Sequence, residues 1–200
     1  MLTNEWVIIA SERAKRPQEF ETKEEARPPL PEFSDSCPFC PGHEEQTPPA
    51  TLTIEKNGKW TVRAFPNKFA SLRNDIPFQP KRVGLFFRAT GYGIAEVIVE
   101  SPQHNLTLAT MDDEAVENVV KAYKQRYESA AREKQICLVN IFQNHGVRAG
   151  TSLAHPHSQL IATPIIPPHV RNPIERAVRY HDTHGHCIYC VMLEEEMRRN

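Results

Sequence analysis

One long helical pattern, at residues 111–133, constrains the fold more than any other feature of this sequence. The pattern opens with an acidic run at 112–114, and negative side chains stabilise the N-terminus of a helix. Its apolar positions are Ala115, Val119, Val120, Ala122 and Tyr123. The sequence therefore predicts one long helix here, against which the rest of the chain has to pack.

Strand patterns flank this helix on both sides. The candidate strands are residues 4–10, 58–65, 93–101, 135–144 and 157–166. Loops separate most of them, and a shorter helix with a proline near its first turn is predicted over 172–184. This order predicts an α+β fold with an antiparallel sheet. The glycines of 144–152 precede a strand instead of opening a helix, which argues against a dinucleotide-binding fold.

Charge and hydropathy argue against several classes of protein. The chain has 24 lysines and arginines against 25 aspartates and glutamates, so no basic excess indicates a long nucleic-acid footprint. No apolar run reaches the length of a membrane span. The first residues lack the layout of a secretory signal, so we expect a cytoplasmic protein.

The cysteines point to metal binding. Their number, five, is odd, so they cannot all pair in disulfides. Four of them form two CxxC motifs, CPFC at 37–40 and CIYC at 187–190, and in a reducing compartment this spacing favours metal chelation. The fifth, Cys137, lies in an apolar run, and we expect it to be buried as a small hydrophobic residue.

The first CxxC motif predicts half of a tetrahedral zinc site. Cys37 and Cys40 supply two thiolates, and the prolines and glycine of CPFCPG suit a tight turn. The strongest candidates for the other two ligands are His104 and His155, each beside a predicted strand, and His43 is a weaker candidate. A Cys₂His₂ set leaves no position for water, so such a zinc would be structural.

The second motif, Cys187 and Cys190, has no histidine after it. Three histidines, His181, His184 and His186, lie just upstream, and the last is too close to Cys187 to bind the same ion without strain. A second metal site therefore either uses these histidines or is completed by sequence beyond the last residue. We favour the second alternative and expect the chain to be a fragment.

The stretch AHPHSQ at 154–159 predicts a row of polar groups. In a strand, His155, His157 and Gln159 would share one face, about 6.6 Å from one to the next. If His155 binds zinc, His157 remains on that face as a nucleophile, and a neutral imidazole can attack phosphorus. Gln159 and Ser152 would donate hydrogen bonds to phosphoryl oxygens, and the backbone of Gly150 could approach them. The alternative is a surface strand with two solvated histidines.

A basic segment near the N-terminus, SERAKRP, offers phosphate contacts. Arg13 and Arg16 carry guanidinium groups that suit phosphate oxygens. By itself, such a segment is usually a solvated surface, so its specificity is low.

Several of these motifs together resemble a known family. NHGVRAGTSLAHPHSQLIATPIIP is similar to the active-site block of the galactose-1-phosphate uridylyltransferases, a branch of the histidine-triad (HIT) superfamily. SERAKRP, CPFCPGHE, RAFPNKF and SPQHNLTL follow the order of that family, so the resemblance covers nearly the whole chain. It implies two tandem HIT-like α+β domains, each with an antiparallel half-barrel sheet and flanking helices. Residues 1–170 would form the first domain, and 171–200 the start of a truncated second one.

The resemblance also implies roles for single residues. His157 matches the histidine that forms a covalent uridylyl intermediate, and Cys37, Cys40, His104 and His155 match a zinc site. The matches to substrate-binding positions are Arg13, Arg16, Asn67, Lys68, Asn144, Gly150, Thr151, Ser152 and Gln159. Cys187 and Cys190 stand where some members carry a second CxxC pair, whose histidines come later.

The implied activity is transfer of UMP from UDP-glucose to galactose 1-phosphate by double displacement, in a Zn²⁺-containing enzyme that is a homodimer at full length. A first alternative is an adenylyltransferase of the ADP-glucose phosphorylase type, because HSQLIATP replaces a glycine-containing version. A second is a catalytically silent zinc-binding fragment. A HIT-type hydrolase is disfavoured, because Gln159 stands where such enzymes usually have a third histidine.

Overall fold

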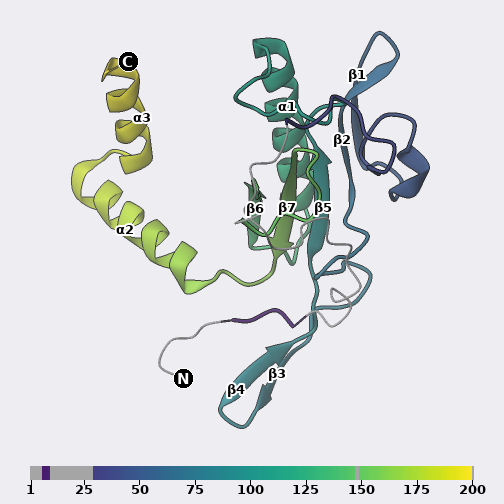
Figure 1. The fold of residues 1–200 in the computed structure, drawn as a ribbon. Helices are drawn as coiled ribbons and strands as arrows, with labels where there is room; N and C mark the ends of the chain where they lie inside the picture. Colours follow the sequence, from purple (N-terminus) through teal and green to yellow (C-terminus); the bar gives the residue numbers. More distant parts are fainter. Residues whose placement is uncertain (1–5, 10–28, 147–148, 200) are drawn as a thin grey trace. The chain divides into compact units, whose positions relative to one another are not determined.

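The computed structural model describes residues 6–9, 29–146 and 149–199 (Figure 1). The chain divides into two units, of which the larger is Ile8–Pro164 and the smaller contains Ile165–Asn200. The assignment of residues 171–200 to the start of a second HIT-like domain is a separate claim and stays a prediction.

The larger unit is built on a five-stranded antiparallel sheet. In spatial order its strands are β1 (Leu52–Lys56), β2 (Lys59–Pro66), β5 (Ile94–Val99), β7 (His157–Thr163) and β6 (Leu138–Gln143). A separate hairpin, β3 (Pro80–Val83) and β4 (Phe86–Ala89), lies in the β2–β5 connection. Helix α1 (Asp113–Ala131) contacts strands of the five-stranded sheet. The predicted α+β fold with an antiparallel sheet is confirmed.

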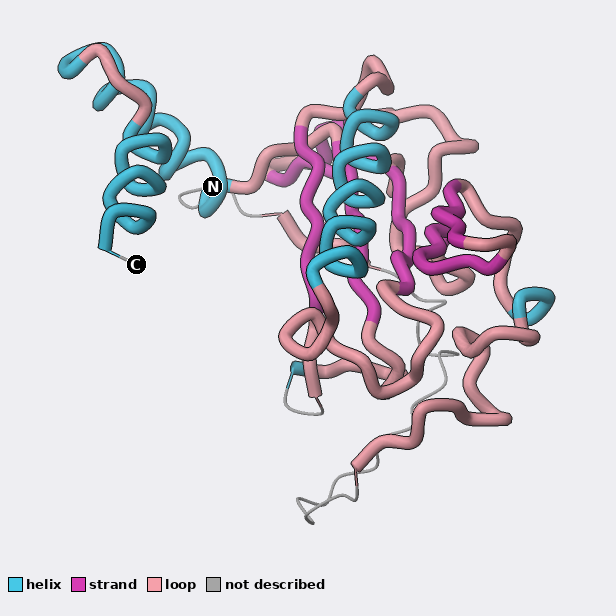
Figure 2. Tube along the Cα trace, turned by 90° about the horizontal axis from the view of Figure 1, so that it is seen from above, coloured by secondary structure: helices cyan, strands magenta, loops and turns pink. Residues whose placement is uncertain are grey.

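Helix α1 begins where the acidic run predicted. The side chain of Asp112 caps it by accepting a hydrogen bond from the Ala115 backbone N–H at 2.8 Å. Asp113 and Glu114 follow in the first turn, where their negative charges interact favourably with the positive end of the helix dipole. Figure 2 shows the helix lying along the strands. The predicted long helix is confirmed, two residues shorter at each end.

The two faces of the sheet pack against different partners, because side chains alternate along a strand. One face forms a hydrophobic core with α1, made of Val62, Ala64, Ile98, Leu160, Ala162, Val119, Ala122 and Ala130. On the other face, Phe65, Val97 and Val99 pack against the turn of residues 37–40. The sheet therefore carries the first CxxC motif on the face opposite to the helix.

A tight hairpin joins the first two strands. Asn57 and Gly58 form its turn with φ angles of 52° and 74°. Positive φ at both central residues is typical of a type I′ turn, which favours Asn-Gly because its twist matches that of the strands. Strand β1 was not predicted from the sequence, although the Asn-Gly dipeptide before β2 indicates a hairpin and therefore a preceding strand.

Two predictions about local structure are wrong. The described part of the segment 4–10, residues 6–9, is not a strand. Cys137 is exposed, because it precedes the edge strand β6 and only its backbone N–H joins the sheet, donating to the Thr163 carbonyl at 2.9 Å.

The smaller unit contains two helices, α2 (Pro168–His184) and α3 (Ile188–Arg199). Helix α2 begins four residues before its predicted start, because Pro168 occupies the first turn and its fixed φ suits that position. Gly185, with φ of 75°, ends the helix in a left-handed conformation. Among the helices of the described residues, none is both long enough and apolar enough to cross a membrane.

Candidate active site and metal centre

The structure brings together the four residues of the predicted zinc site. Their ligand atoms, the sulfurs of Cys37 and Cys40 and ring nitrogens of His104 and His155, all lie within 4.8 Å of one another. All four residues are buried. Two come from the 37–40 turn, one from the loop after β5 and one from the bend before β7. Three distant segments of the chain therefore meet at this metal cluster.

The spacing of the cluster suits a zinc ion. His104 Nδ1 lies 3.5 Å from Cys40 Sγ, and His155 Nδ1 lies 3.6 Å from Cys37 Sγ and 3.7 Å from Cys40 Sγ. Tetrahedral zinc, with bonds of about 2.3 Å to sulfur and about 2.0–2.1 Å to nitrogen, separates the two atoms by about 3.5 Å. Thiolate and imidazole are also the ligands that zinc takes in structural sites.

Backbone groups stabilise the cysteines in this arrangement. The N–H of Phe39 donates to Cys37 Sγ, and the N–H of Ser34 donates to Cys40 Sγ, both at 3.4 Å. Burial nevertheless raises the pKa of Cys37 to about 12, with a further contribution from the neighbouring Cys40. A divalent cation would offset this cost of ionising buried thiols, so the cluster is suited to a metal.

His155 presents the correct nitrogen to the cluster. Its Nε2–H donates to the Ser101 carbonyl at 2.8 Å, so the lone pair is on Nδ1, which faces the sulfurs. Burial lowers the pKa of His155 to about 4, and a neutral imidazole is the form that binds a metal. His43, the weaker candidate, lies outside the cluster, and its Nδ1–H donates to the Cys37 carbonyl at 2.7 Å. It supports the turn instead of supplying a ligand.

The second CxxC motif is not part of a comparable group. Cys187 and Cys190 are exposed at the start of α3, and within the described residues they belong to no cluster of three or more metal-ligating side chains. The backbone N–H groups of Cys190 and Tyr189 lower the pKa of Cys187. The upstream histidines do not complete this pair in the structure.

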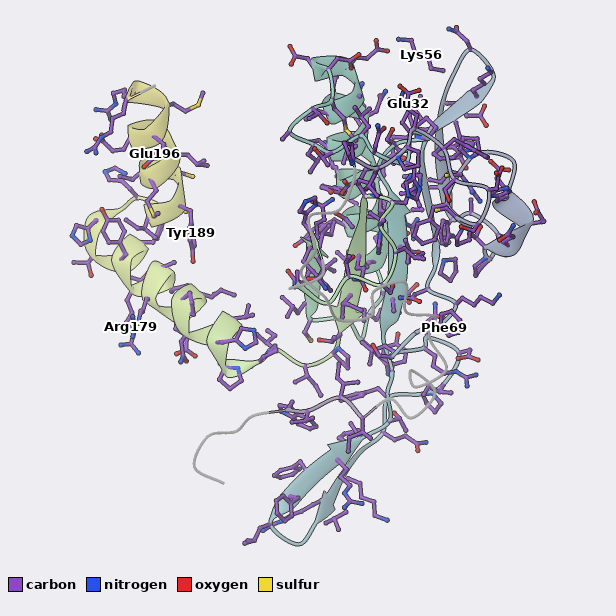
Figure 3. All side chains as sticks on the ribbon, in the orientation of Figure 1. Glu32, Lys56, Phe69, Arg179, Tyr189 and Glu196 are labelled. Atoms are coloured by element: carbon purple, nitrogen blue, oxygen red, sulfur yellow. The ribbon has the colours of Figure 1, made fainter. Side chains whose placement is uncertain are left out.

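A cavity of about 490 Å³ opens on the sheet face that carries the metal cluster. Its polar walls include His157 and Gln159 from β7, Asn67 and Lys68 after β2, and Ser152. The rest of its lining is Ser36, Pro38, Phe39, Gln46, Thr47, Pro48, Phe65, Phe69, Val97 and Leu153. Phe69 lies beyond the end of β2, where Figure 3 labels it. Apolar and aromatic walls with a few polar groups are typical of small-molecule sites.

His157 is held at the wall of this cavity with only 6% of its surface exposed. Its Nδ1–H donates to the carbonyl of His155 at 2.8 Å. The Phe39 ring contacts it edge-on, with centroids 5.2 Å apart at 72°. Because Nδ1 carries the proton, Nε2 carries the lone pair and is the nucleophilic atom of the ring.

The predicted polar row is correct for two of its three members. His157 and Gln159 share the cavity face of β7. His155 precedes the strand, because β7 begins only at His157 after Pro156, which has no N–H for the ladder. Its ring therefore turns to the metal cluster while the next histidine lines the cavity.

Only some of the other predicted substrate-binding residues line the cavity. Asn67, Lys68 and Ser152 line the cavity together with His157 and Gln159. Asn144, Gly150 and Thr151 are not among the residues that line it. Arg13 and Arg16 lie outside the described residues.

Sequence reasoning missed the aromatic side of the cavity. Phe39 lies between the two cysteines, Phe65 is in β2, and Phe69 follows that strand. The alternation along β2 separates Phe65 from Val62 and Ala64, which face the helix, but nothing in the sequence says which face holds a cavity. Their contribution depends on the packing of the 37–40 turn.

Comparison with known proteins gives a consistent picture. The model of the galactose-1-phosphate uridyl transferase N-terminal domain matches residues 1–167. ADP-glucose phosphorylase of Arabidopsis thaliana is 33% identical over 193 residues, covering 94% of this chain and 54% of the relative. Galactose-1-phosphate uridylyltransferase of Thermotoga maritima is 28% identical over 196 residues, covering 98% and 55%.

Solved structures agree with the sequence comparison. The crystal structure of the Arabidopsis thaliana ADP-glucose phosphorylase with bound ADP-glucose superposes with a TM-score of 0.67 at 28% identity, covering 94% of this chain and 55% of that one. The chain thus spans about half the length of the relatives that it matches. Because the family model matches more than four-fifths of its residues, the chain belongs to the galactose-1-phosphate uridyl transferase family, to whose N-terminal domain it corresponds.

Proposed function

We propose that this protein is a nucleotidyltransferase that works by double displacement through His157. Its Nε2 attacks the α-phosphorus of a nucleoside diphosphate sugar, a P–N bond forms, and the P–O bond to the departing sugar 1-phosphate breaks. A phosphate oxygen of the second substrate then attacks the same phosphorus, the P–N bond breaks, and His157 is released. The observation that carries this proposal is the hydrogen bond from His157 Nδ1 to the His155 carbonyl, which leaves the lone pair on Nε2 of a ring at the cavity wall.

The other cavity residues have roles that fit this reaction. Gln159 and Ser152 would donate hydrogen bonds to the non-bridging oxygens, whose charge grows in the transition state. Lys68 would offset the charge of the phosphates. The rings of Phe65 and Phe69 would hold the nucleobase.

We also propose that Cys37, Cys40, His104 and His155 hold a zinc ion with a structural role. The ion would supply no chemistry at the reacting phosphorus, since four protein ligands leave no open position. Its effect on catalysis would be indirect, through the position of His157. His155 would be held as one of its ligands, and the carbonyl of His155 accepts the hydrogen bond that orients the ring of His157.

The predicted reaction is transfer of UMP from UDP-glucose to galactose 1-phosphate. The second candidate is adenylyl transfer from ADP-glucose, and one observation favours it: the ADP-glucose phosphorylase of Arabidopsis thaliana is 33% identical to this chain. Both reactions use the same nucleophile and differ in the base that the aromatic walls accept. The location in the cytoplasm, the homodimer at full length and the absence of a nucleic-acid partner also stay predictions.

The intact mass of the protein tests this proposal. The protein is mixed with UDP-glucose in one tube and ADP-glucose in another, and quenched in alkali, which preserves a phosphohistidine-type bond. A mass gain of one uridylyl group that disappears in His157→Ala supports the predicted reaction, and a gain of adenylyl alone supports the second candidate. No adduct from either donor, in folded protein that contains zinc, would overturn the nucleotidyl-histidine for these residues.

A further inference from the structure

A buried carboxylate lies directly behind the strand that carries His157. Glu100 follows β5 and is only 1% exposed. It accepts three hydrogen bonds, from the hydroxyls of Tyr123 at 2.6 Å and Ser158 at 2.5 Å and from Gln143 Nε2 at 2.8 Å. These donors belong to α1, β7 and β6. The four residues, called the Glu100 cluster below, therefore join one helix and three strands at a single point.

The Glu100 cluster lies beside the backbone of His157, the proposed nucleophile. Ser158 follows His157 directly and faces the opposite side of β7, because side chains alternate along a strand. Val99, the residue before Glu100, pairs with His157 across the sheet, and the next residue, Ser101, accepts the hydrogen bond from His155. Val99, Glu100 and Ser101 thus contact three of the four residues of the HPHS stretch.

A second buried carboxylate shows what a purely structural link between these elements looks like. Glu96, within β5, is 3% exposed and binds Arg126 of α1 through two hydrogen bonds of 2.7 and 2.8 Å. This ion pair also fastens the helix to the sheet. Its partner in β7 is Leu160, three residues beyond His157. Both carboxylates are therefore buried and both bind a side chain of α1, one from within β5 and one from directly after it, but only Glu100 binds a side chain adjacent to His157.

We propose that Glu100 is a positioning residue for His157, acting through Ser158 from the face of the sheet opposite the cavity. The proposal rests on the nucleotidyl-histidine mechanism above. Tyr123 and Gln143 hold the carboxylate in place, and the carboxylate holds the start of β7. The imidazole then points Nε2 into the cavity at the angle that an in-line attack on phosphorus needs.

Two matched pairs of variants separate positioning from stability. Tyr123→Phe removes one hydroxyl from the Glu100 cluster, and Tyr127→Phe makes the same change at an exposed position one turn along α1. Glu100→Gln removes the charge behind His157, and Glu96→Gln makes the same change in the ion pair with Arg126. If either glutamine variant fails to fold, the isosteric tyrosine pair still decides the question.

The first measurement is the rate of nucleotidyl-histidine formation against donor concentration. We expect Tyr123→Phe and Glu100→Gln to lower the saturating rate about tenfold, since a misplacement of about 1 Å can cost about 100-fold. The donor concentration for half-maximal rate should stay within about twofold, because the cavity walls are intact. Tyr127→Phe and Glu96→Gln should keep the wild-type rate. An unchanged rate in Tyr123→Phe, or an equal loss in Glu96→Gln, would overturn the proposal.

The second measurement does not depend on activity. Long-range ¹H–¹⁵N spectra of protein labelled at histidine report the tautomer and hydrogen bonding of each ring, and His157→Gln assigns the resonances. We expect the His157 nitrogens to shift in Tyr123→Phe and to match wild type in Tyr127→Phe. If wild type forms no adduct, the proposed function fails while these spectra still test the positioning. Identical spectra in both tyrosine variants would exclude it.

Discussion

At the residue scale, two hydrogen bonds to backbone carbonyls decide what the histidines of the HPH motif can do. His155 gives its Nε2 proton to Ser101, so Nδ1 faces the thiols. His157 gives its Nδ1 proton to His155, so the lone pair is on Nε2. Two residues of one type, two positions apart, therefore take opposite tautomers, which suit the two different tasks proposed for them. The motif predicts both tasks, but only the fold says which carbonyl each ring reaches.

In the loop after β2, the role of Asn67 also depends on the hydrogen bonds that the fold gives it. The side-chain oxygen of Asn67 accepts a hydrogen bond from the Phe69 backbone N–H at 2.9 Å. The backbone N–H of Asn67 donates to the Ala95 carbonyl at 2.9 Å. Asn67 therefore shapes the loop that presents Phe69 to the cavity. This local role adds to the nucleoside contact that the sequence predicts for it.

Replacing Phe69 by leucine should weaken nucleotide binding without unfolding the protein. Stacking of a base on an aromatic ring contributes about 1–3 kcal/mol, so we expect the affinity for UDP or ADP to fall about tenfold. Phe69 is half-buried and is not part of the hydrophobic core clusters, so the melting temperature should change little. Titration calorimetry measures the affinity. Phe78→Leu, at a half-buried phenylalanine that does not line the cavity, is the control. Equal affinity losses in both variants would contradict a stacking role for Phe69.

At the element scale, the sequence predicts the parts that bury a periodic face. Helix α1 and strands β2, β5, β6 and β7 all have clear apolar patterns, and all are confirmed within a few residues. Strands β3 and β4 were missed because nearly all of their residues are exposed, and β1 was missed because only Leu52 and Ile54 alternate in its five residues. The metal cluster was predictable because its four ligands have a restricted chemistry. The aromatic cavity walls were not, because their role depends on which face of the sheet the 37–40 turn covers.

Gly93, just before the first residue of β5, lies close against the backbone of β7. A Cβ added there would lie 2.4 Å from the Ala162 carbonyl oxygen and 2.9 Å from Leu72 Cδ1, and φ is +155°. The carbonyl is backbone and cannot move without disturbing β7, the strand that carries His157. The absence of a side chain at Gly93 therefore allows β5 to pair with β7 from its first residue, Ile94, opposite Ala162.

We expect Gly93→Ala to lower the free energy of unfolding by about 2 kcal/mol or more, a size typical of overpacking combined with backbone strain. The control is Gly91→Ala, whose added Cβ would meet only the Ser71 carbonyl at an ordinary 3.6 Å. That variant should stay within about 0.5 kcal/mol of wild type. Urea unfolding followed by tryptophan fluorescence measures both. A Gly93→Ala protein as stable as Gly91→Ala would show that β5 and β7 can separate at this end without loss.

At the scale of the larger unit, the metal cluster would become a cross-link between segments far apart in the sequence once it holds an ion. Its sulfur–nitrogen contacts join residues 64 and 118 positions apart. Without a metal, the same place holds two buried thiols, one with a strongly raised pKa, and two buried imidazoles. We expect the cavity to depend on this cross-link, because Phe39 comes from the 37–40 turn and the carbonyl of His155 orients the ring of His157. Stability and reactivity should therefore respond together to the metal.

Zinc content and its removal test this coupling. We expect about one zinc per chain by elemental analysis, lost in Cys37→Ser and retained in Cys187→Ser, whose thiol belongs to no such cluster among the described residues. Chelation should lower the melting temperature by roughly 10 °C or more, since a structural zinc contributes on the order of 10 kcal/mol in small zinc domains. The same treatment should abolish the nucleotidyl adduct, and added zinc should restore both properties. Because the ion would hold His155, and His155 orients His157, an adduct that forms at the normal rate in zinc-free protein would separate the metal from the nucleophile and refute the coupling.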